Sequence, residues 1–366
     1  MKVMFVLSGL GVGGAERVIS LISEEWINRG WEVAIVAFDS PRDPLGFNFA
    51  PGIDLIRLGI PAGGGSKLRG IRSSVMRITA LRRLMKERRP DIVLSFLTKV
   101  NVLTLIASTG TPVPVVISER NNPQAQAAHP VWARAWVALS HRAKGIVLQT
   151  ETIRGFYPPG IGERATVIPN VVEAPAREAR PHEGKVLVAA GRLDRQKGFD
   201  LLIAAFARIA GRFPEWRLVI WGEGQERAAL EAQVRATGLV DRIALPGNSP
   251  RPVSWVEEAD LFVMSSRYEG FGNVVVEAMQ AGLPVVSYDC NFGPRDIIAH
   301  GEDGLLVKPE SVSDLADSLA RMMADPALRK RLATKARKTS QRFNRAAIVS
   351  LWDSLVHKVV YSAKGV

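Results

Sequence analysis

The sequence has one cysteine, Cys290, in 366 residues. No disulfide can form within the chain, and a single thiol cannot build a cysteine-based zinc site. A reducing, cytoplasmic setting is therefore expected. Acids are also few relative to bases: 48 lysines and arginines stand against 36 aspartates and glutamates, a formal charge of +12. A positive field of this size attracts polyanions such as nucleic acid, anionic lipid or phosphorylated substrates.

Long apolar runs are absent as well. No stretch approaches the roughly 18 apolar residues that a membrane span needs. The start, MKVMFVLSGLGVGGAER, has too short an apolar region for a secretory signal. We expect a soluble or peripheral protein on these grounds. Aromatic residues make up only 7% of the chain and no RNA- or DNA-binding motif is present, so no nucleic-acid partner is expected.

The sequence does contain many short apolar runs rich in valine, isoleucine and leucine. Helical segments separate these runs, which predicts doubly wound parallel sheets covered on both faces. The runs are KVMFVLS, EVAIVAF, IDLIRL, DIVLSFL, VPVVIS, GIVLQT and ATVIPN in the first half, then KVLVAAG, RLVIWG, RIALPG, ADLFVMSS, LPVVSYD and GLLVKP in the second.

A stretch without apolar periodicity, NVVEAPAREARPHEGK at 170–185, separates the two halves and is predicted to be a linker. We therefore expect domains at 1–172 and 173–342, since a chain of this length usually exceeds one core. The tail at 343–366 predicts an amphipathic helix that packs back on the first domain. The residues expected on its apolar face are Ile348, Leu351, Trp352, Leu355 and Val359.

The most basic stretch, residues 67–89, predicts a second amphipathic helix. The expected apolar face is Val75, Ile78, Leu81 and Leu84, with Met76 and Met85 alongside; the expected polar face is Arg72, Arg77, Arg82, Arg83, Lys86, Arg88 and Arg89. A basic amphipathic helix can lie on an anionic membrane surface. An ordinary surface helix with a solvated basic face fits the same pattern equally well.

The loop after the first predicted strand holds Gly9, Gly11 and Gly14, which fit the dinucleotide fingerprint G-x-G-x-x-G, and Asp39 ends the next strand. Glu16 argues against this interpretation, because an acid in the first helical turn opposes a bound pyrophosphate. Asp39 is then an ordinary strand-end acid.

In doubly wound sheets, ligands bind beyond the carboxyl ends of the strands. In the second half, Arg192 and Lys197 flank a loop that ends one strand, and Gly198 opens a helix. Two cations beside a helix N-terminus predict an anion site that would fit a nucleotide diphosphate. A later turn carries Glu223, which either meets a polar ligand group or lies in an ordinary exposed turn.

Two glutamates bracket a third loop, in the stretch SSRYEGFGNVVVEAMQAGLPVV. Glu269 precedes the glycines, and Glu277 lies one turn into a helix expected to begin near Asn273. The loop N–H groups can hold phosphate, and each carboxylate can accept hydrogen bonds from two sugar hydroxyls. Glu277 at this place also suits the helix dipole alone. Spacing does not decide between these roles.

The combination of Glu269-x7-Glu277, GRLDRQKGFD, GGAERV and VIPNVV resembles glycosyltransferase family 4. The four motifs occur in the expected order over nearly the whole chain. The resemblance implies the GT-B fold, an α/β architecture in which two doubly wound Rossmann-like domains face each other across a cleft. It also implies retaining transfer of a sugar from a nucleotide-sugar.

The resemblance further implies roles for individual residues. Arg192 and Lys197 would bind the donor diphosphate, Glu277 the nucleotide ribose, and Glu269 hydroxyls of the donor sugar. The remaining implied donor contacts are Gly270, Phe271, Gly272, Asn273 and Val274 near sugar and phosphate, and Gly247 and Asn248 near the base. In the first domain, Gly13, Gly14 and Glu16 would form that domain's side of the site.

The chain departs from the family at one place. Family members often carry a histidine after a mid-domain strand, whereas this chain reads VVISERNNPQ and its nearest histidine is His129. The SERNNP stretch resembles members that extend polyprenyl-diphosphate-linked oligosaccharides. In that interpretation Glu119, Arg120 and Asn121 approach the donor sugar or the acceptor phosphate. A local salt bridge at Glu119 is the structural alternative.

No two aspartates are spaced Asp-x-Asp, the usual metal-holding motif of sugar transferases, so metal-independent chemistry without a cofactor is expected. The hypothesis is transfer from a UDP-sugar to a polyprenyl-diphosphate-linked sugar acceptor, at the inner face of the membrane and on an anionic membrane surface. A nucleotide-sugar epimerase, with Glu119 and His129 as acid and base, is the alternative enzyme. A nucleic-acid-binding protein is the non-enzymatic alternative.

Overall fold

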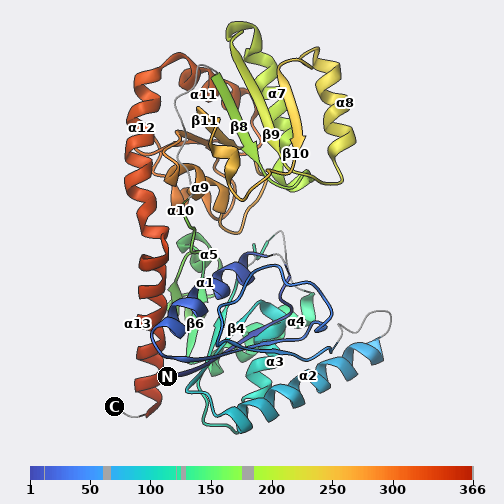
Figure 1. Ribbon diagram of the computed structural model, residues 1–366, viewed down its shortest axis with the longest axis vertical. Coiled ribbons are helices and arrows are strands. Elements are labelled where there is room, and N and C mark those ends of the chain that lie inside the picture. The colour runs from blue at the N-terminus through green and yellow to red at the C-terminus, as the bar shows by residue number, and fades with distance from the viewer. Residues whose placement is uncertain (12, 61–66, 121, 125–128, 175–184, 365–366) are drawn as a thin grey trace. The chain divides into compact units, whose positions relative to one another are not determined.

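The computed structural model describes residues 1–366 apart from 12, 61–66, 121, 125–128, 175–184 and 365–366. Two compact units divide the chain, Met1–Val171 with Arg345–Val366 as unit 1 and Val172–Asn344 as unit 2. Figure 1 shows a sheet with flanking helices in each unit. Most of the expected linker, and the expected site residue Asn121, lie outside the described residues.

Unit 1 is built on a parallel sheet in the order β3-β2-β1-β4-β5-β6-β7. Its strands are β1 (Lys2–Leu7), β2 (Glu32–Ala37), β3 (Asp54–Arg57), β4 (Ile92–Phe96), β5 (Val115–Ser118), β6 (Gly145–Leu148) and β7 (Ala165–Val167). Its helices are α1 (Gly14–Asn28), α2 (Lys67–Arg88), α3 (Thr98–Ala107), α4 (Pro130–Leu139), α5 (Glu151–Phe156), α6 (Pro159–Gly162) and α13 (Arg345–Lys364), with the 3₁₀ turn η1 (Ser140–Arg142).

Unit 2 has a second parallel sheet in the order β10-β9-β8-β11-β12-β13. Its strands are β8 (Lys185–Ala190), β9 (Trp216–Trp221), β10 (Ile243–Gly247), β11 (Leu261–Met264), β12 (Val285–Tyr288) and β13 (Leu305–Val307). Its helices are α7 (Phe199–Ile209), α8 (Arg227–Thr237), α9 (Asn273–Gln280), α10 (Pro294–Ile297), α11 (Val312–Ala324) and α12 (Pro326–Thr339), with 3₁₀ turns η2 (Arg195–Lys197), η3 (Ala210–Arg212), η4 (Ser254–Val256) and η5 (Ser340–Phe343).

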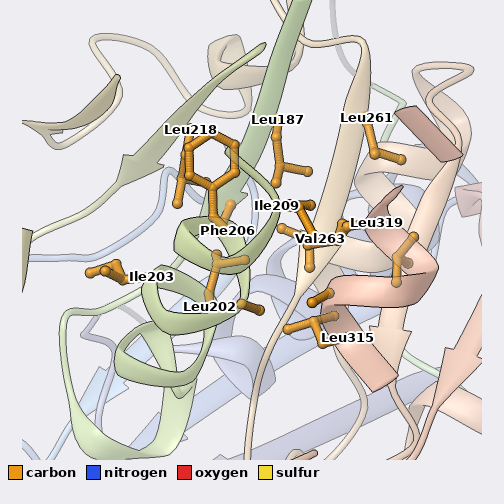
Figure 2. Close-up of a cluster of buried hydrophobic side chains, with 14 of the residues drawn as sticks. Leu187, Leu202, Ile203, Phe206, Ile209, Leu218, Leu261, Val263, Leu315 and Leu319 are labelled. Carbon is orange, nitrogen blue, oxygen red and sulfur yellow. The ribbon is translucent and has the colours of Figure 1, made fainter. Parts of the chain in front are cut away.

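Both faces of the unit 2 sheet are buried, which explains its near-continuous apolar strands. On one face, strands β8, β9 and β11 pack against helices α7 and α11; Figure 2 shows Leu187, Leu218 and Val263 meeting Phe206 and Leu319. The alternate strand residues face a second core on the other side, where Val188 and Phe262 pack against α9. The two-residue period of a strand therefore supplies both cores at once.

The tail helix α13 packs on unit 1. Ile348, Trp352 and Val359 are buried in the same core as α1, and the Trp26 indole N–H donates to the Asp353 carboxylate at 2.7 Å. The expected face was wrong at one position, because Leu351 is 41% exposed.

The basic helix α2 has a different buried face from the one expected. Leu81 and Met85 are buried as expected, whereas Val75 and Met76 are exposed and Arg77 is buried. The Arg77 guanidinium donates to the Ile60 carbonyl at 2.7 Å and lies 4.6 Å from the centre of the Phe38 ring. A long arginine stem can pack against apolar surface, and this contact turns α2 away from the expected orientation.

Candidate active site

The order of the strands in unit 2 brings two predicted loops together. The strand β8 lies between β9 and β11, and the direction of the strand order reverses between β8 and β11. Such a switch point leaves room at the carboxyl ends of the two strands. The loop at 191–198 follows β8 and the loop at 265–272 follows β11, so residues about 70 positions apart in sequence become neighbours.

The first of these loops is shaped by its own residues. The Asp194 carboxylate accepts from the Lys197 N–H at 3.2 Å and caps the turn η2. Gly198 then adopts φ +62° and begins α7. A Cβ at Gly198 would overlap the Ser265 carbonyl oxygen, so only glycine allows the two loops to approach this closely.

The buried ion pair between Lys197 and Glu269 joins the two loops. The Lys197 ammonium lies 2.6 Å from Glu269 Oε1, and the two side chains are only 16% and 8% exposed. The Ser266 hydroxyl donates to the same carboxylate oxygen at 2.7 Å, and the Ser265 hydroxyl donates to the Lys197 carbonyl at 2.9 Å. The structure thus brings together Lys197, predicted to bind the donor diphosphate, and Glu269, predicted to bind the donor sugar, in one buried cluster.

A second ion pair that the sequence did not single out joins the loop after β11 to the start of α7. The Arg267 guanidinium makes two hydrogen bonds to the Asp200 carboxylate at 2.8 and 2.7 Å. These bonds hold the pKa of Asp200 below its usual range. The Gln196 amide also donates to the Tyr268 carbonyl at 3.0 Å. Arg267 and Asp200 are 67 residues apart in sequence, and neither lies in a spacing that signals a pair.

The glycine loop leads into α9 without a side-chain cap. Gly272 has φ +101° at the N-cap, and Asn273 is the first residue of the helix. The uncapped N–H groups and the helix dipole favour a negative charge here. Phe271 is buried against Phe343, with ring centres 5.5 Å apart, so its side chain anchors the loop in the core. Glu277 follows on the same helix and is 5% exposed.

A pocket of about 400 Å³ opens beside these loops. It is lined by four residues that the sequence predicts as donor contacts, Arg192, Glu223, Asn248 and Val274, and Gly191 adjoins the Lys197 side chain. The additional lining residues that the sequence did not single out include Trp221, Trp255, Pro250 and Arg251. Volumes of this order hold small ligands in proteins.

Arg192 and Glu223, two residues predicted to contact the sugar donor, are more exposed than the Lys197–Glu269 pair. Arg192 is 73% exposed and lies 3.4 Å from the Asp194 carboxylate. Glu223 accepts from Arg227 at 2.7 and 2.6 Å, which lowers the pKa of Glu223. A Cβ at Gly247 would lie 3.1 Å from Glu223 Oε1, so Gly247 approaches the same carboxylate.

In unit 1, the predicted glycine loop forms the entry to α1. Gly13 is the N-cap and makes no side-chain capping bond, and Gly14 is the first helical residue. The Glu16 carboxylate occupies the space where a Cβ at Gly13 would lie, and burial raises the pKa of Glu16. Asp39 accepts from the Leu10 N–H and pairs with Arg57, both at 2.8 Å, which fits the interpretation of a structural strand-end acid.

Glu119 lies at the carboxyl end of β5 and is 3% exposed. Its carboxylate accepts from the Thr98 hydroxyl at 2.9 Å and the Asn101 amide at 2.8 Å. Burial raises its pKa to about 7. Both partners are neutral, so the expected alternative of a local salt bridge is wrong among the residues the structure describes.

Arg120 is also buried, but its partners lie elsewhere. It donates to the Ser118 hydroxyl, the Ile168 carbonyl and the Asn170 side-chain oxygen at 3.0, 3.2 and 3.0 Å. Burial without a carboxylate partner lowers its pKa to about 9. One guanidinium nitrogen, Nη2, is buried and has no hydrogen-bond partner among the described residues.

Among the described residues, no three histidine, cysteine, aspartate or glutamate side chains gather closely enough to hold a metal ion. Within the same residues, every helix is too short or too polar to cross a membrane.

The fold has close structural counterparts. A sucrose-phosphate synthase from Thermosynechococcus elongatus matches 99% of this chain and all of its own at a TM-score of 0.84 and 20% identity. The Anabaena HepE structure in complex with UDP and glucose matches 98% of this chain and 99% of its own at a TM-score of 0.77 and 20% identity. These likenesses show that the chain has the GT-B fold.

Two family models match successive parts of the sequence. A "Glycosyl transferase 4-like domain" covers residues 13–171, and "Glycosyl transferases group 1" covers residues 172–339. The fold and these matches define the protein as a glycosyltransferase. The chain belongs to glycosyltransferase family 4, as the sequence motifs predicted. The glycosyltransferase matches give no support to the epimerase alternative.

Two curated relatives differ in how much of their own length is matched. An exopolysaccharide phosphotransferase of Streptomyces coelicolor is 36% identical over 59% of this chain, a match that spans only 23% of that longer protein. A Campylobacter jejuni protein is 24% identical over 98% of this chain and 99% of its own length. Its name is GalNAc-alpha-(1->4)-GalNAc-alpha-(1->3)-diNAcBac-PP-undecaprenol alpha-1,4-N-acetyl-D-galactosaminyltransferase.

Proposed function

We propose that this glycosyltransferase moves a sugar from a UDP-sugar to a lipid-diphosphate-linked sugar acceptor, in the assembly of a cell-surface polysaccharide or glycan. We propose that transfer retains the anomeric configuration and needs no metal ion or resident cofactor. The observation that carries the proposal is the buried Lys197–Glu269 pair, held between two loops beside the N-terminus of α9 and the pocket.

The donor half of the proposal follows from charge. Breaking a glycosyl–diphosphate bond develops negative charge on the leaving phosphate, and fixed cations with helix N–H groups stabilise such charge. Lys197 would bind this phosphate while Glu269 fixes its ammonium, and Arg192 would reach it from the pocket wall. No reorganisation of Lys197 is then needed at the moment of transfer.

The sugar and the nucleoside would lie on either side of this diphosphate. Glu269 would accept from donor sugar hydroxyls, beside the backbone of Gly270, Phe271, Gly272 and Asn273. Glu277 would accept from the ribose hydroxyls, and the pocket past Val274 would hold the base near Gly247, Asn248 and Glu223. The binding of UDP by the structurally similar HepE supports a UDP-sugar as the donor.

The acceptor half rests on unit 1. In unit 1, Gly13, Gly14 and Glu16 would contact the transferred sugar or its acceptor, and Glu119, Arg120 and Asn121 would bind the acceptor phosphate or the sugar. With a pKa of about 7, Glu119 carries a proton in much of the population at neutral pH. A protonated carboxyl donates a hydrogen bond, which suits a phosphate or sugar oxygen. The Campylobacter relative, named for a PP-undecaprenol-linked oligosaccharide, supports the lipid-linked acceptor.

The test is a screen of UDP-, GDP- and ADP-sugars against polyprenyl-diphosphate-linked acceptors, with products identified by mass spectrometry. We expect a glycosylated acceptor from a UDP-sugar, an unchanged rate in EDTA, and an α-linked product from an α-linked donor by NMR. Formation of an epimerised nucleotide-sugar without acceptor would overturn the transferase assignment. Complete loss of activity in EDTA would overturn the metal-free mechanism, and an inverted product the retaining one.

A further inference from the structure

The first half of α2 carries an unusual group of exposed apolar side chains. Leu68, Ile71, Val75 and Met76 are 79%, 63%, 56% and 47% exposed. Single exposed apolar residues are normal, but several together mark a binding surface. Figure 1 shows α2 on the outside of unit 1. We call these four residues the α2 apolar stripe.

The stripe is a continuous feature of the helix rather than a scatter. At 3.6 residues per turn, residues 68, 71 and 75 lie along one side of α2, and residue 76 lies about 80° around the helix from residue 68. A different side of the helix holds Ser73, Arg77 and Leu81, which are buried against unit 1. The helix therefore has an apolar contact with its own unit and a second, separate apolar surface facing solvent.

The charges around the stripe are almost all positive. The helix sequence KLRGIRSSVMRITALRRLMKER has eight lysines and arginines and one acid, Glu87. That acid pairs with Arg83 at 2.6 Å, near the other end of the helix. Arg69 and Arg72 are exposed beside the stripe itself. An apolar stripe bordered by cations is complementary to a surface with anionic groups outside and hydrocarbon beneath.

We propose that the α2 apolar stripe docks this enzyme on an anionic lipid bilayer, with Arg69 and Arg72 at the level of the lipid phosphates. Aliphatic side chains of an interfacial helix insert into the boundary of the acyl region while basic stems reach the headgroups. A protein partner fits less well, because protein interfaces are enriched in aromatic residues and the stripe has none. The proposal deepens the proposed function, since it assigns the surface that would bring the enzyme to a lipid-linked acceptor.

The test is co-sedimentation with vesicles of phosphatidylcholine alone and of phosphatidylcholine with phosphatidylglycerol. We expect the wild type to bind the anionic vesicles only, and the variant I71E/V75E to bind them at least about tenfold more weakly, because two carboxylates would have to enter the acyl boundary. Arg72→Glu should weaken binding roughly fivefold or more, since each basic side chain near such a surface contributes about that factor. The matched control is Val240→Glu, an equally exposed apolar position (55%) in unit 2.

Circular dichroism would establish that the variants fold, and a short-chain, water-soluble acceptor gives their basal turnover. Equal turnover on that acceptor, with a loss only on acceptor embedded in vesicles, supports the docking role. Unchanged vesicle binding in I71E/V75E would overturn it, as would a wild-type dimer that this variant makes monomeric in sedimentation. If the wild type binds anionic vesicles through the stripe but glycosylates no acceptor, the proposed function fails and the docking surface stands.

Discussion

Replacing Lys197 by methionine tests the ion pair on which the donor site depends. Methionine keeps most of the length of the side chain and removes the charge. The Glu269 carboxylate, 8% exposed, would then lose an ammonium group at 2.6 Å while it keeps the Ser266 hydroxyl at 2.7 Å. Removing one member of a buried pair leaves a buried charge without its counterion, which costs more than the pair itself contributed.

The expected loss of stability is about 3–5 kcal/mol, the range for breaking a buried ion pair. For a unit of this size, that is a decrease in Tm on the order of 10 °C. The matched control is Lys185→Met, which breaks the pair with Glu215 at 2.7 Å, where both side chains are nearly half exposed. Exposed pairs of this kind contribute about 0–1 kcal/mol, so the control should barely shift Tm.

A double variant, K197M/E269Q, separates stability from chemistry. Its glutamine is neutral and still accepts from Ser266, so most of the lost Tm should return. Turnover should stay at least about a hundredfold below wild type, because the cation at the leaving phosphate is gone. Thermal unfolding and donor turnover measure the two effects. Wild-type turnover in the double variant would refute the catalytic role of the pair, and an unchanged Tm in Lys197→Met would refute the buried-charge argument.

Three further outcomes follow from the same contacts. Gly198→Ala should lower stability by about 1–3 kcal/mol and raise the KM for donor, because its Cβ would overlap the Ser265 carbonyl; Gly238→Ala, also at positive φ but in open space, should show the strain alone in thermal unfolding. Glu119 has a folded-state pKa of about 7, above its unfolded value, so its contribution to the free energy of unfolding is fully present below about pH 4.5 and is lost as the pH rises through 7. Glu119→Gln should therefore remove a pH dependence of about 3 kcal/mol from the free energy measured by urea unfolding, and a flat wild-type profile would contradict this. Glu277→Ala should raise the KM for donor at least about tenfold, and unchanged kinetics would remove the ribose-binding role.

The fold was predictable to the level of individual strands. Each of the thirteen apolar runs forms a strand, and both sheets are parallel as expected. Strands buried on both faces leave an unbroken apolar signature in the sequence, which explains this success. The start of α9 at Asn273 was predicted for a local reason as well, since Gly272 with positive φ stops any earlier helical turn.

The orientation of α2 could not be predicted, because two apolar faces compete on the same helix. Val75 and Ile78 suggest one face, whereas Ser73 and Arg77 occupy the buried one. What decides between them is a tertiary contact: the Arg77 guanidinium reaches the Ile60 carbonyl. Hydrophobic periodicity assigns arginine to the solvent, so it places this side chain on the wrong side.

The candidate site, like the fold, was predictable from the sequence only in part. The sequence could place Lys197 and Glu269 after two strands of one sheet, and the sheet order, in which β8 and β11 are neighbours, brings their side chains within 2.6 Å. It contains no sign of the Arg267–Asp200 bonds, which join the loop after β11 to the start of α7, because a contact between residues 67 positions apart has no local pattern. Loop positions are set by strand topology, whereas the bonds that hold the loops depend on side-chain geometry.

The SER stretch at 118–120 shows why residue type and order alone do not assign a role. Adjacent residues at a strand end point to opposite faces, so Glu119 and Arg120 have separate surroundings. The neutral partners Thr98 and Asn101 hold Glu119, and its burial leaves a proton on a carboxyl near neutral pH. Arg120 instead lies 5.7 and 5.5 Å from the ring centres of Phe96 and Trp352 and ties β5 to the segment after β7 and to α13. Glu119 is therefore the member of this stretch whose charge an arriving phosphate can change most readily. Arg120 instead has a structural role, because its contacts hold the tail helix α13 against the sheet, and this role does not depend on a bound ligand.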